Sequence, residues 1–137
     1  MLYSTDTWRY MKEGYVPHAR EYAVWKPRVR PEDLEKIKDA LNNRMDANQI
    51  HVSSWIPGAD WMGTVYQPLY EATMMDETMA AMFFGLVLWE TLMERDDVWG
   101  FVKWEQSCSL DEYRSDPKNK PRGMVYWRLI PAPKEGM

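Results

Sequence analysis

The sequence is poor in the residues that build disulfides and metal sites. Its 137 residues include one cysteine, Cys108, and two histidines, His18 and His51. A single cysteine cannot form an intramolecular disulfide, and a structural zinc site needs about four cysteine or histidine ligands at close spacing. Cys108 has no histidine near it in the sequence, so we interpret it as an inert thiol. We expect no disulfide and no metal site.

Nucleotide-binding and hydrolase motifs are absent too. The sequence has no G-x-x-x-x-G-K-[ST] phosphate loop, no G-x-G-x-x-G dinucleotide pattern and no G-x-S-x-G nucleophile turn. His51 could approach Ser53 or Ser54 and Asp60, as a catalytic triad requires. However, His51 and Ser53 would sit on one strand without the sharp turn that exposes a nucleophile. We expect no catalytic residue and no cofactor.

Paired carboxylates occur at Asp76-Glu77 and at Asp96-Asp97. The two pairs would lie at opposite ends of a helix about 30 Å long, because each helical residue adds about 1.5 Å. A glycosidase-type acid–base pair needs its carboxyl groups within about 10 Å of each other. Helix capping and solubility therefore explain these acids better than catalysis does.

No apolar run is long enough to cross a bilayer, which takes about 20 residues. The opening stretch, MLYSTDTWRYMKEGY, is polar and aromatic rather than apolar. We therefore expect a cytoplasmic protein that makes no membrane contact. A chain of this length is expected to form one domain over residues 1–137.

Positive charge is scarce in the middle of the chain. Residues 49–97 carry eight acidic residues and one basic residue, Arg95, within a net charge of −4. The two flanking parts are mildly basic. Because a nucleic-acid-binding protein shows a basic patch, this distribution argues against general nucleic-acid binding and permits docking on a basic protein surface.

The most apolar part of the sequence predicts a buried central helix. Residues 79–89 are apolar apart from Gly85, and they show no polar stripe at helical period. We predict a helix over about 74–95 that is capped by Thr73 or Asp76. Gly85 should cost about 1 kcal/mol of helix propensity, so we expect a neighbouring element to approach closely there.

Hydrophobic periodicity predicts the other elements. Spacing of three and four at Leu34, Ile37 and Leu41 indicates an amphipathic helix over residues 31–43. A short helix is also expected over Thr7–Glu13. Alternation predicts strands over Arg20–Lys26, Ile50–Ile56, Val98–Gln106 and Met124–Ile130, the last with Val125, Trp127 and Leu129 on its core side.

These elements predict an α+β fold. A small, mainly antiparallel sheet of three or four strands should pack against the central helix (about 74–95) and the amphipathic helix (about 31–43). The last two strands are expected to pair as an antiparallel hairpin.

The connection that leads into the central helix is the best candidate binding surface. It is long for a compact domain, and long ordered loops are often functional. It gathers aromatic residues around a carboxylate, and the acidic turn after the central helix adds two more acids. The predicted partner-binding residues are Trp55, Asp60, Trp61, Tyr66, Tyr70, Asp96 and Asp97.

A basic and aromatic run offers an alternative surface, made of Arg20, Trp25, Lys26, Arg28 and Arg30. Arginines beside aromatic rings can hold single-stranded nucleic acid by phosphate contact and base stacking. The negative net charge and the short run argue against this reading. Positive charge on a strand edge that deters edge pairing is the preferred interpretation.

Taken together, these features favour a small acidic binding protein without enzymatic activity that occludes a basic surface of a protein partner in a stoichiometric complex. In its size and its lack of catalytic motifs, the chain resembles the small inhibitors that phages and mobile elements carry, such as anti-CRISPR and anti-restriction proteins. This resemblance covers no motif, and it implies inhibition of a host defence system. Two alternatives stay open: a small-ligand-binding or sugar-active enzyme with its pocket in the Trp55–Tyr70 loop, and single-stranded nucleic-acid binding through Arg20–Arg30. Self-association also stays open.

Overall fold

The computed structural model describes residues 1–5, 7–47, 50–52, 61–103 and 124–133. The helices of this part of the chain are α1 (Ala19–Trp25), the 3-10 helix η1 (Lys26–Arg28), α2 (Pro31–Ala47), α3 (Gln67–Ala72) and α4 (Glu77–Glu94). The strands are β1 (Leu2–Ser4), β2 (Arg9–Tyr10), β3 (Ile50–Val52), β4 (Trp99–Lys103) and β5 (Met124–Arg128).

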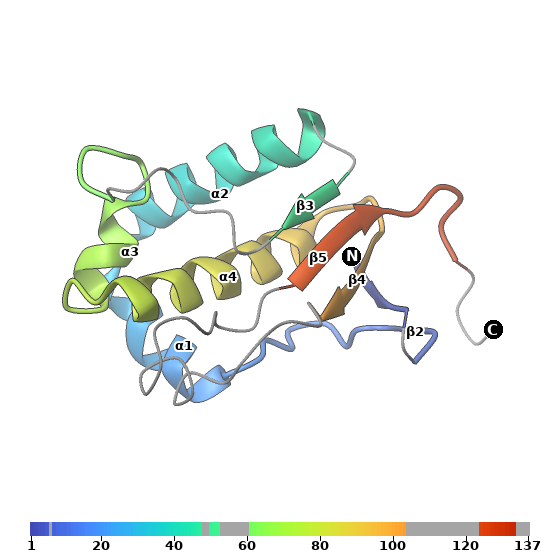
Figure 1. The fold of residues 1–137 in the computed structure, drawn as a ribbon, viewed down its shortest axis with the longest axis horizontal. Helices are drawn as coiled ribbons and strands as arrows, with labels where there is room; N and C mark the ends of the chain where they lie inside the picture. The colour runs from blue at the N-terminus through green and yellow to red at the C-terminus, as the bar shows by residue number, and fades with distance from the viewer. Residues whose placement is uncertain (6, 48–49, 53–60, 104–123, 134–137) are drawn as a thin grey trace, which may run out of the picture.

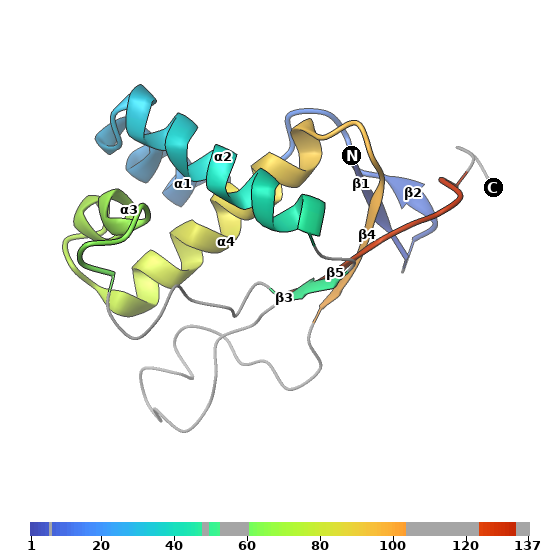
Figure 2. The ribbon, with the colours of Figure 1, turned by 90° about the horizontal axis from the view of Figure 1, so that it is seen from above.

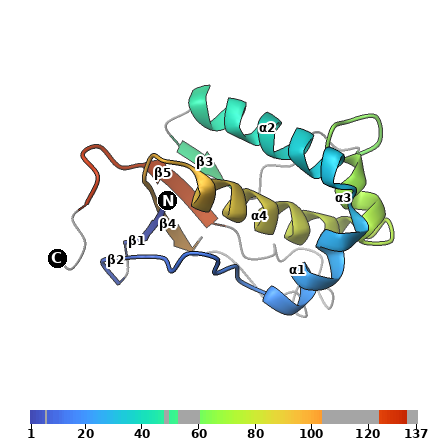
Figure 3. The ribbon, with the colours of Figure 1, turned by 180° about the vertical axis from the view of Figure 1, so that it is seen from behind.

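The strands form one mixed sheet in the order β2-β1-β4-β5-β3. Neighbouring strands are antiparallel except β1 and β4, which run parallel with Leu2 opposite Trp99. Beside the sheet, α2, α4 and α1 lie next to one another with α4 in the middle (Figures 1 and 3). The sheet packs beside the C-terminal half of α4, and α3 lies near the N-terminal end of α4 (Figure 2). The predicted α+β class, with a small, mainly antiparallel sheet packed on a central helix, is confirmed.

Helix α4 lies in the core because its side chains are apolar on nearly every side. Nine of its residues are buried, and Phe83, Phe84 and Leu88 have no exposed surface. Each large apolar side chain that is fully buried contributes about 1.5–3 kcal/mol. The helix begins after Asp76, whose side chain accepts a hydrogen bond from the backbone N–H of Met79. Asp76 is therefore the cap of the two candidates.

We predicted that a neighbouring element approaches α4 closely at Gly85, and this prediction is wrong. A Cβ added at Gly85 would have no neighbour within 4 Å. Close approach occurs instead at Gly100 of β4, where an added Cβ would lie 3.2 Å from Leu129 and 3.2 Å from Trp127. The glycine that packing requires is thus in the sheet, while the one in α4 leaves space.

The predicted strand over Arg20–Lys26 is wrong, because this segment forms α1 and the start of η1. A strand would bury alternate residues such as Tyr22 and Val24. The structure instead buries Tyr22 and Trp25, three residues apart, against Phe83 of α4, and leaves Val24 53% exposed. The segment is too short for its period to be recognised from the sequence alone.

The predicted helix over Thr7–Glu13 is also wrong, since this region forms the turn after β1, strand β2 and the chain beyond it. Helix α2, in contrast, is confirmed and extends four residues past its predicted end, to Ala47. The reason is that its buried stripe continues: Ile37, Leu41 and Met45 follow at intervals of four, and none has exposed surface.

Strands β4 and β5 pair as the predicted antiparallel hairpin, but the core side of β5 was predicted wrongly. The core side of β5 carries Tyr126, which is 1% exposed and lies opposite Phe101 of β4. Phe101 in turn contacts Trp89 of α4, with 4.9 Å between the ring centroids. Trp127 and Leu129 lie on the other face, with Gly100. The predicted strand ends at residues 53–56 and 104–106 lie outside the described residues.

Candidate functional site: an acidic groove between two helices

The aromatic loop that we predicted as a binding surface enters the core where the structure describes it. Trp61 is 3% exposed and Tyr66 6%, and both rings pack edge-on against Phe84. Tyr70 is half-buried and stacks on Trp61 with an angle of 5° between the ring planes. Trp55 and Asp60 lie outside the described residues. A partner could reach Tyr70 in this conformation, but Trp61 and Tyr66 serve as packing.

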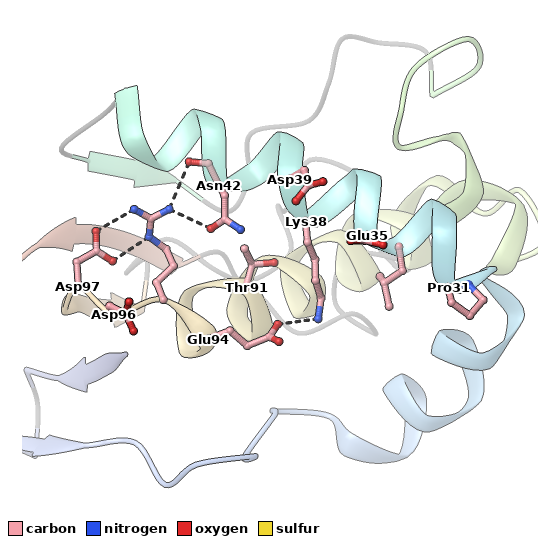
Figure 4. Close-up of a pocket in the computed structure, with 11 residues that line it drawn as sticks. Pro31, Glu35, Lys38, Asp39, Asn42, Thr91, Glu94, Asp96 and Asp97 are labelled. Atoms are coloured by element: carbon pink, nitrogen blue, oxygen red, sulfur yellow. Dashed lines mark hydrogen bonds and ion pairs between the residues drawn. The ribbon is translucent and has the colours of Figure 1, made fainter.

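Asp96 and Asp97, the acidic turn of the prediction, lie at the other end of α4. There they border an open groove of about 760 Å³ between α2 and the end of α4 (Figure 4). The groove is lined by Pro31, Leu34, Glu35, Lys38, Asp39, Asn42, Thr91, Glu94, Arg95, Asp96 and Asp97. The lining therefore contains five carboxylates and two cations.

Arg95 joins the two walls of the groove. Its guanidinium donates hydrogen bonds to Asp97 at 2.8 Å and 2.9 Å, to Asp46 at 2.6 Å and to the side-chain oxygen of Asn42 at 2.9 Å. Arg95 donates these hydrogen bonds to the Asp97 carboxylate, and they hold the pKa of Asp97 below its ordinary value and raise the pKa of Arg95. The N-terminal ammonium of Met1 reaches the same turn and donates to the carbonyl oxygen of Asp97. Both charges of the Arg95–Asp97 pair are thus used within the chain.

Lys38 forms the second link between α2 and α4. Its ammonium lies 2.5 Å from Glu90 and 2.6 Å from Glu94, and Lys26 of η1 contacts Glu90 at 3.1 Å. Burial alone would raise the pKa of Glu90, but the hydrogen bonds from Lys38 and Lys26 bring it below its ordinary value. Glu90 therefore stays ionised and ties three helical elements together.

Three acids of the groove face solvent without such a partner. Glu35, Asp39 and Asp96 are exposed, and the described part of the chain gives none of them an ion pair. Glu94, though paired with Lys38, keeps 59% of its side chain exposed. The two cations of the groove are occupied and most of its acids are accessible, so the groove presents negative charge.

The sequence indicated one wall of this groove and missed the other. Asp96 and Asp97 were among the predicted site residues, whereas Glu35 and Asp39 were not. Their spacing of four residues places them on one side of α2. That signal could have suggested an acidic stripe, but only the packing of α2 beside α4 joins it to the acidic turn (Figure 4).

The basic and aromatic run is largely occupied in other contacts. Trp25 is 8% exposed and packs against Phe83. Lys26 pairs with Glu90, and Arg28 donates from Nη1 to the carbonyl oxygen of Ala72 at 2.9 Å. Arg30 lies 3.5 Å from Glu32 and from Asp33, and Arg20 is exposed on α1. A row of cations and free rings, which single-stranded nucleic acid needs, does not form here.

Comparisons of the chain with protein-family models, with curated proteins and with solved structures find no match. Among the described residues, no group of three or more His, Cys, Asp or Glu side chains could hold a metal ion. None of the helices in this part of the chain combines the length and apolar character needed to cross a membrane.

Proposed function

We propose that the chain is a non-enzymatic binding protein whose acidic groove takes a basic segment of a protein partner. The observation that carries this proposal is the charge of the groove: five carboxylates line it, and its two cations, Lys38 and Arg95, are both engaged within the chain. A partner's lysine or arginine side chains would find acceptors at Glu35, Asp39 and Asp96 with no need to displace an existing pair.

The floor of the groove supports a segment with some apolar character. Leu34 and Pro31 line it together with Thr91, which is buried and donates its hydroxyl to the carbonyl oxygen of Val87. Apolar contact on this floor would supply affinity, whereas the rim carboxylates would speed association and discriminate against acidic partners. A basic, partly apolar segment fits both features.

The mode of action that we propose is stoichiometric occlusion. A protein that covers a basic surface blocks whatever that surface binds, in the manner of the small inhibitors of host defence that phages and mobile elements carry. The single cysteine suits a reducing compartment, so we place this interaction in the cytoplasm.

The proposal is tested by neutralising the exposed rim. In a triple variant, Glu35→Gln, Asp39→Asn and Asp96→Asn, the affinity for the partner should fall about tenfold, since three rim pairs of about 0.5 kcal/mol each are lost. Immobilised wild-type and variant protein would be used to capture partners from host lysate at low and high salt. The captured protein would be identified by mass spectrometry, and its dissociation constant would be measured for both forms.

A matched control removes negative charge elsewhere. Glu13 and Glu21 are exposed and lie outside the groove, so changing both to Gln should leave capture unchanged. Capture should also weaken as salt rises, because screening acts on exposed charges. Equal loss of capture in the groove variant and in the Glu13→Gln, Glu21→Gln control, or capture that is indifferent to salt, would refute the groove as the binding surface.

A further inference from the structure

The turn between α3 and α4 has an unusual backbone. Met74 and Met75 both have positive φ, 60° and 61°. L-residues other than glycine avoid this region because Cβ crowds the following carbonyl oxygen. Two such residues in succession, neither of them glycine or asparagine, form a strained turn, and such strain concentrates where a structure serves a function.

Hydrogen bonds on every side hold this turn in place. Each of the last four carbonyl groups of α3 accepts at least one hydrogen bond. The Thr73 hydroxyl donates to Leu69 and Tyr70, and the Met75 N–H also donates to Tyr70. The Met74 N–H donates to Glu71, and Arg28 donates to Ala72. The Thr73 side chain is itself buried. The end of α3 is thus fully satisfied in this conformation, which explains how the strain persists.

The strained backbone turns two apolar side chains out to solvent. Met74 is 81% exposed and Met75 is 57% exposed, although most other large apolar residues described are buried. Methionine side chains are flexible and polarisable, and they adapt to varied apolar surfaces. Exposed adjacent methionines held by a rigid, satisfied turn have the properties of a small apolar anchor.

The charges around the turn limit what the anchor can bind. Glu71 and Glu77 are exposed on either side of it, and Asp76 caps α4 beside it. Arg28, a described cation beside the turn, is engaged with the carbonyl oxygen of Ala72. Among the residues that the structure describes here, negative charge predominates, which disfavours an anionic membrane surface and favours an apolar patch flanked by lysine or arginine.

We propose that the Met74–Met75 turn is a second docking site, which takes the apolar face of a lysine-flanked helix on a partner protein. It is separate from the acidic groove, because α4 extends for about 26 Å between them at about 1.5 Å per residue. The inference goes beyond the proposed function and does not depend on it.

The test uses a labelled amphipathic helix of leucine and lysine as the probe, with binding followed by fluorescence anisotropy. Replacing both methionines by glycine, Met74→Gly with Met75→Gly, removes the side chains and relieves the strain together. In protein whose groove is neutralised by Glu35→Gln, Asp39→Asn and Asp96→Asn, the two methionine changes should weaken peptide binding at least tenfold. The melting temperature should nevertheless rise by a few degrees with these two changes, which separates lost contact from lost folding.

The β1–β2 hairpin supplies a matched control. Trp8 also has positive φ, 60°, and is 65% exposed, so Trp8→Gly makes the same kind of change far from the turn. Trp8→Gly should raise the melting temperature and leave peptide binding unchanged. A leucine–glutamate helix of the same pattern should bind more weakly than the lysine form.

The groove variant separates this proposal from the previous one. The leucine–lysine helix is basic and partly apolar, so the groove is expected to bind it as well, and the methionine changes are therefore measured in the Glu35→Gln, Asp39→Asn, Asp96→Asn background, where the groove has lost its exposed carboxylates. Three results would overturn the proposal: no saturable binding of the leucine–lysine helix to wild type, unchanged binding in the glycine variant, or equal binding of the leucine–glutamate helix. The role of the groove is decided separately, by its own triple variant and its control.

Discussion

At the scale of single residues, Glu90 has the most consequential position among the charged side chains described. It lies on α4 with 16% of its side chain exposed, between Lys38 of α2 and Lys26 of η1. A carboxylate in this position is favourable only while its partners are present, because a buried unpaired charge is costly. Its charge therefore links the groove to the packing of the helices.

We expect Glu90→Gln to lower the free energy of unfolding at pH 7 by about 1–3 kcal/mol, since the amide cannot balance two ammonium groups. The pKa of Glu90 is lowered in the folded state, so its stabilisation is present above the unfolded pKa and is lost as pH falls through the folded one. The deficit of the variant should accordingly shrink below pH of about 4. Urea denaturation of both proteins at several pH values measures this.

Glu94→Gln is the matched comparison, because Glu94 contacts the same lysine from a largely exposed position. Its cost should stay below about 1 kcal/mol, as is usual for exposed ion pairs. A Glu94 variant as unstable as the Glu90 variant would show that burial of the carboxylate is not what matters.

At the scale of elements, α4 contains Gly85, which lowers the helix propensity of α4 and makes no close packing contact that requires a glycine. Gly85 is in the middle of the helix, and an added Cβ would meet nothing within 4 Å. Gly85→Ala should therefore raise the free energy of unfolding by about 1 kcal/mol, the difference in helix propensity between the two residues. Chemical denaturation decides the matter, and a loss of stability would mean that the helix or its neighbours must shift to admit the methyl group.

The elements also show where sequence reasoning succeeds. α2 was predicted because it is long enough to repeat its apolar spacing several times, as the stripe of Ile37, Leu41 and Met45 does. α4 was predicted because residues 79–89 are apolar apart from Gly85. The β4–β5 hairpin was predicted because both strands are rich in valine and aromatic residues. α1 was missed because seven residues fit alternation and helical spacing alike, and the difference lies in whether Val24 or Trp25 meets Phe83.

The candidate site was also predicted only in part from the sequence. The Asp96–Asp97 turn was found from local charge, but Glu35 and Asp39 join it only through the parallel placement of α2 beside α4 (Figure 4). Trp61 was taken for a surface anchor because an aromatic residue in a loop has the same local signature whether it packs inward or outward. Its contacts with Tyr70 and Phe84 come from tertiary structure that no local pattern encodes.

At the scale of the whole molecule, the two proposed surfaces lie toward opposite ends of α4. The helix that carries them is held in the core by nine buried residues. Rigid partners of this kind bind with little ordering cost. In the two proposals, the groove would contribute charge and the methionine turn would contribute apolar contact to the binding of a partner.

The parallel pairing of β1 with β4 has a consequence for how the chain acquires its structure. Leu2 lies opposite Trp99, so these partners are about 100 residues apart in sequence, and such distant contacts form late. During synthesis at about 5–20 residues per second, β1 would wait about 5–20 s for β4 to emerge. We expect the backbone amides of β1 to gain protection after those of α2 and α4 in pulsed hydrogen exchange during refolding. Protection of the β1 amides before those of α4 would contradict this order. Until β1 pairs with β4, the edge of β4 that β1 covers in the folded sheet stays open.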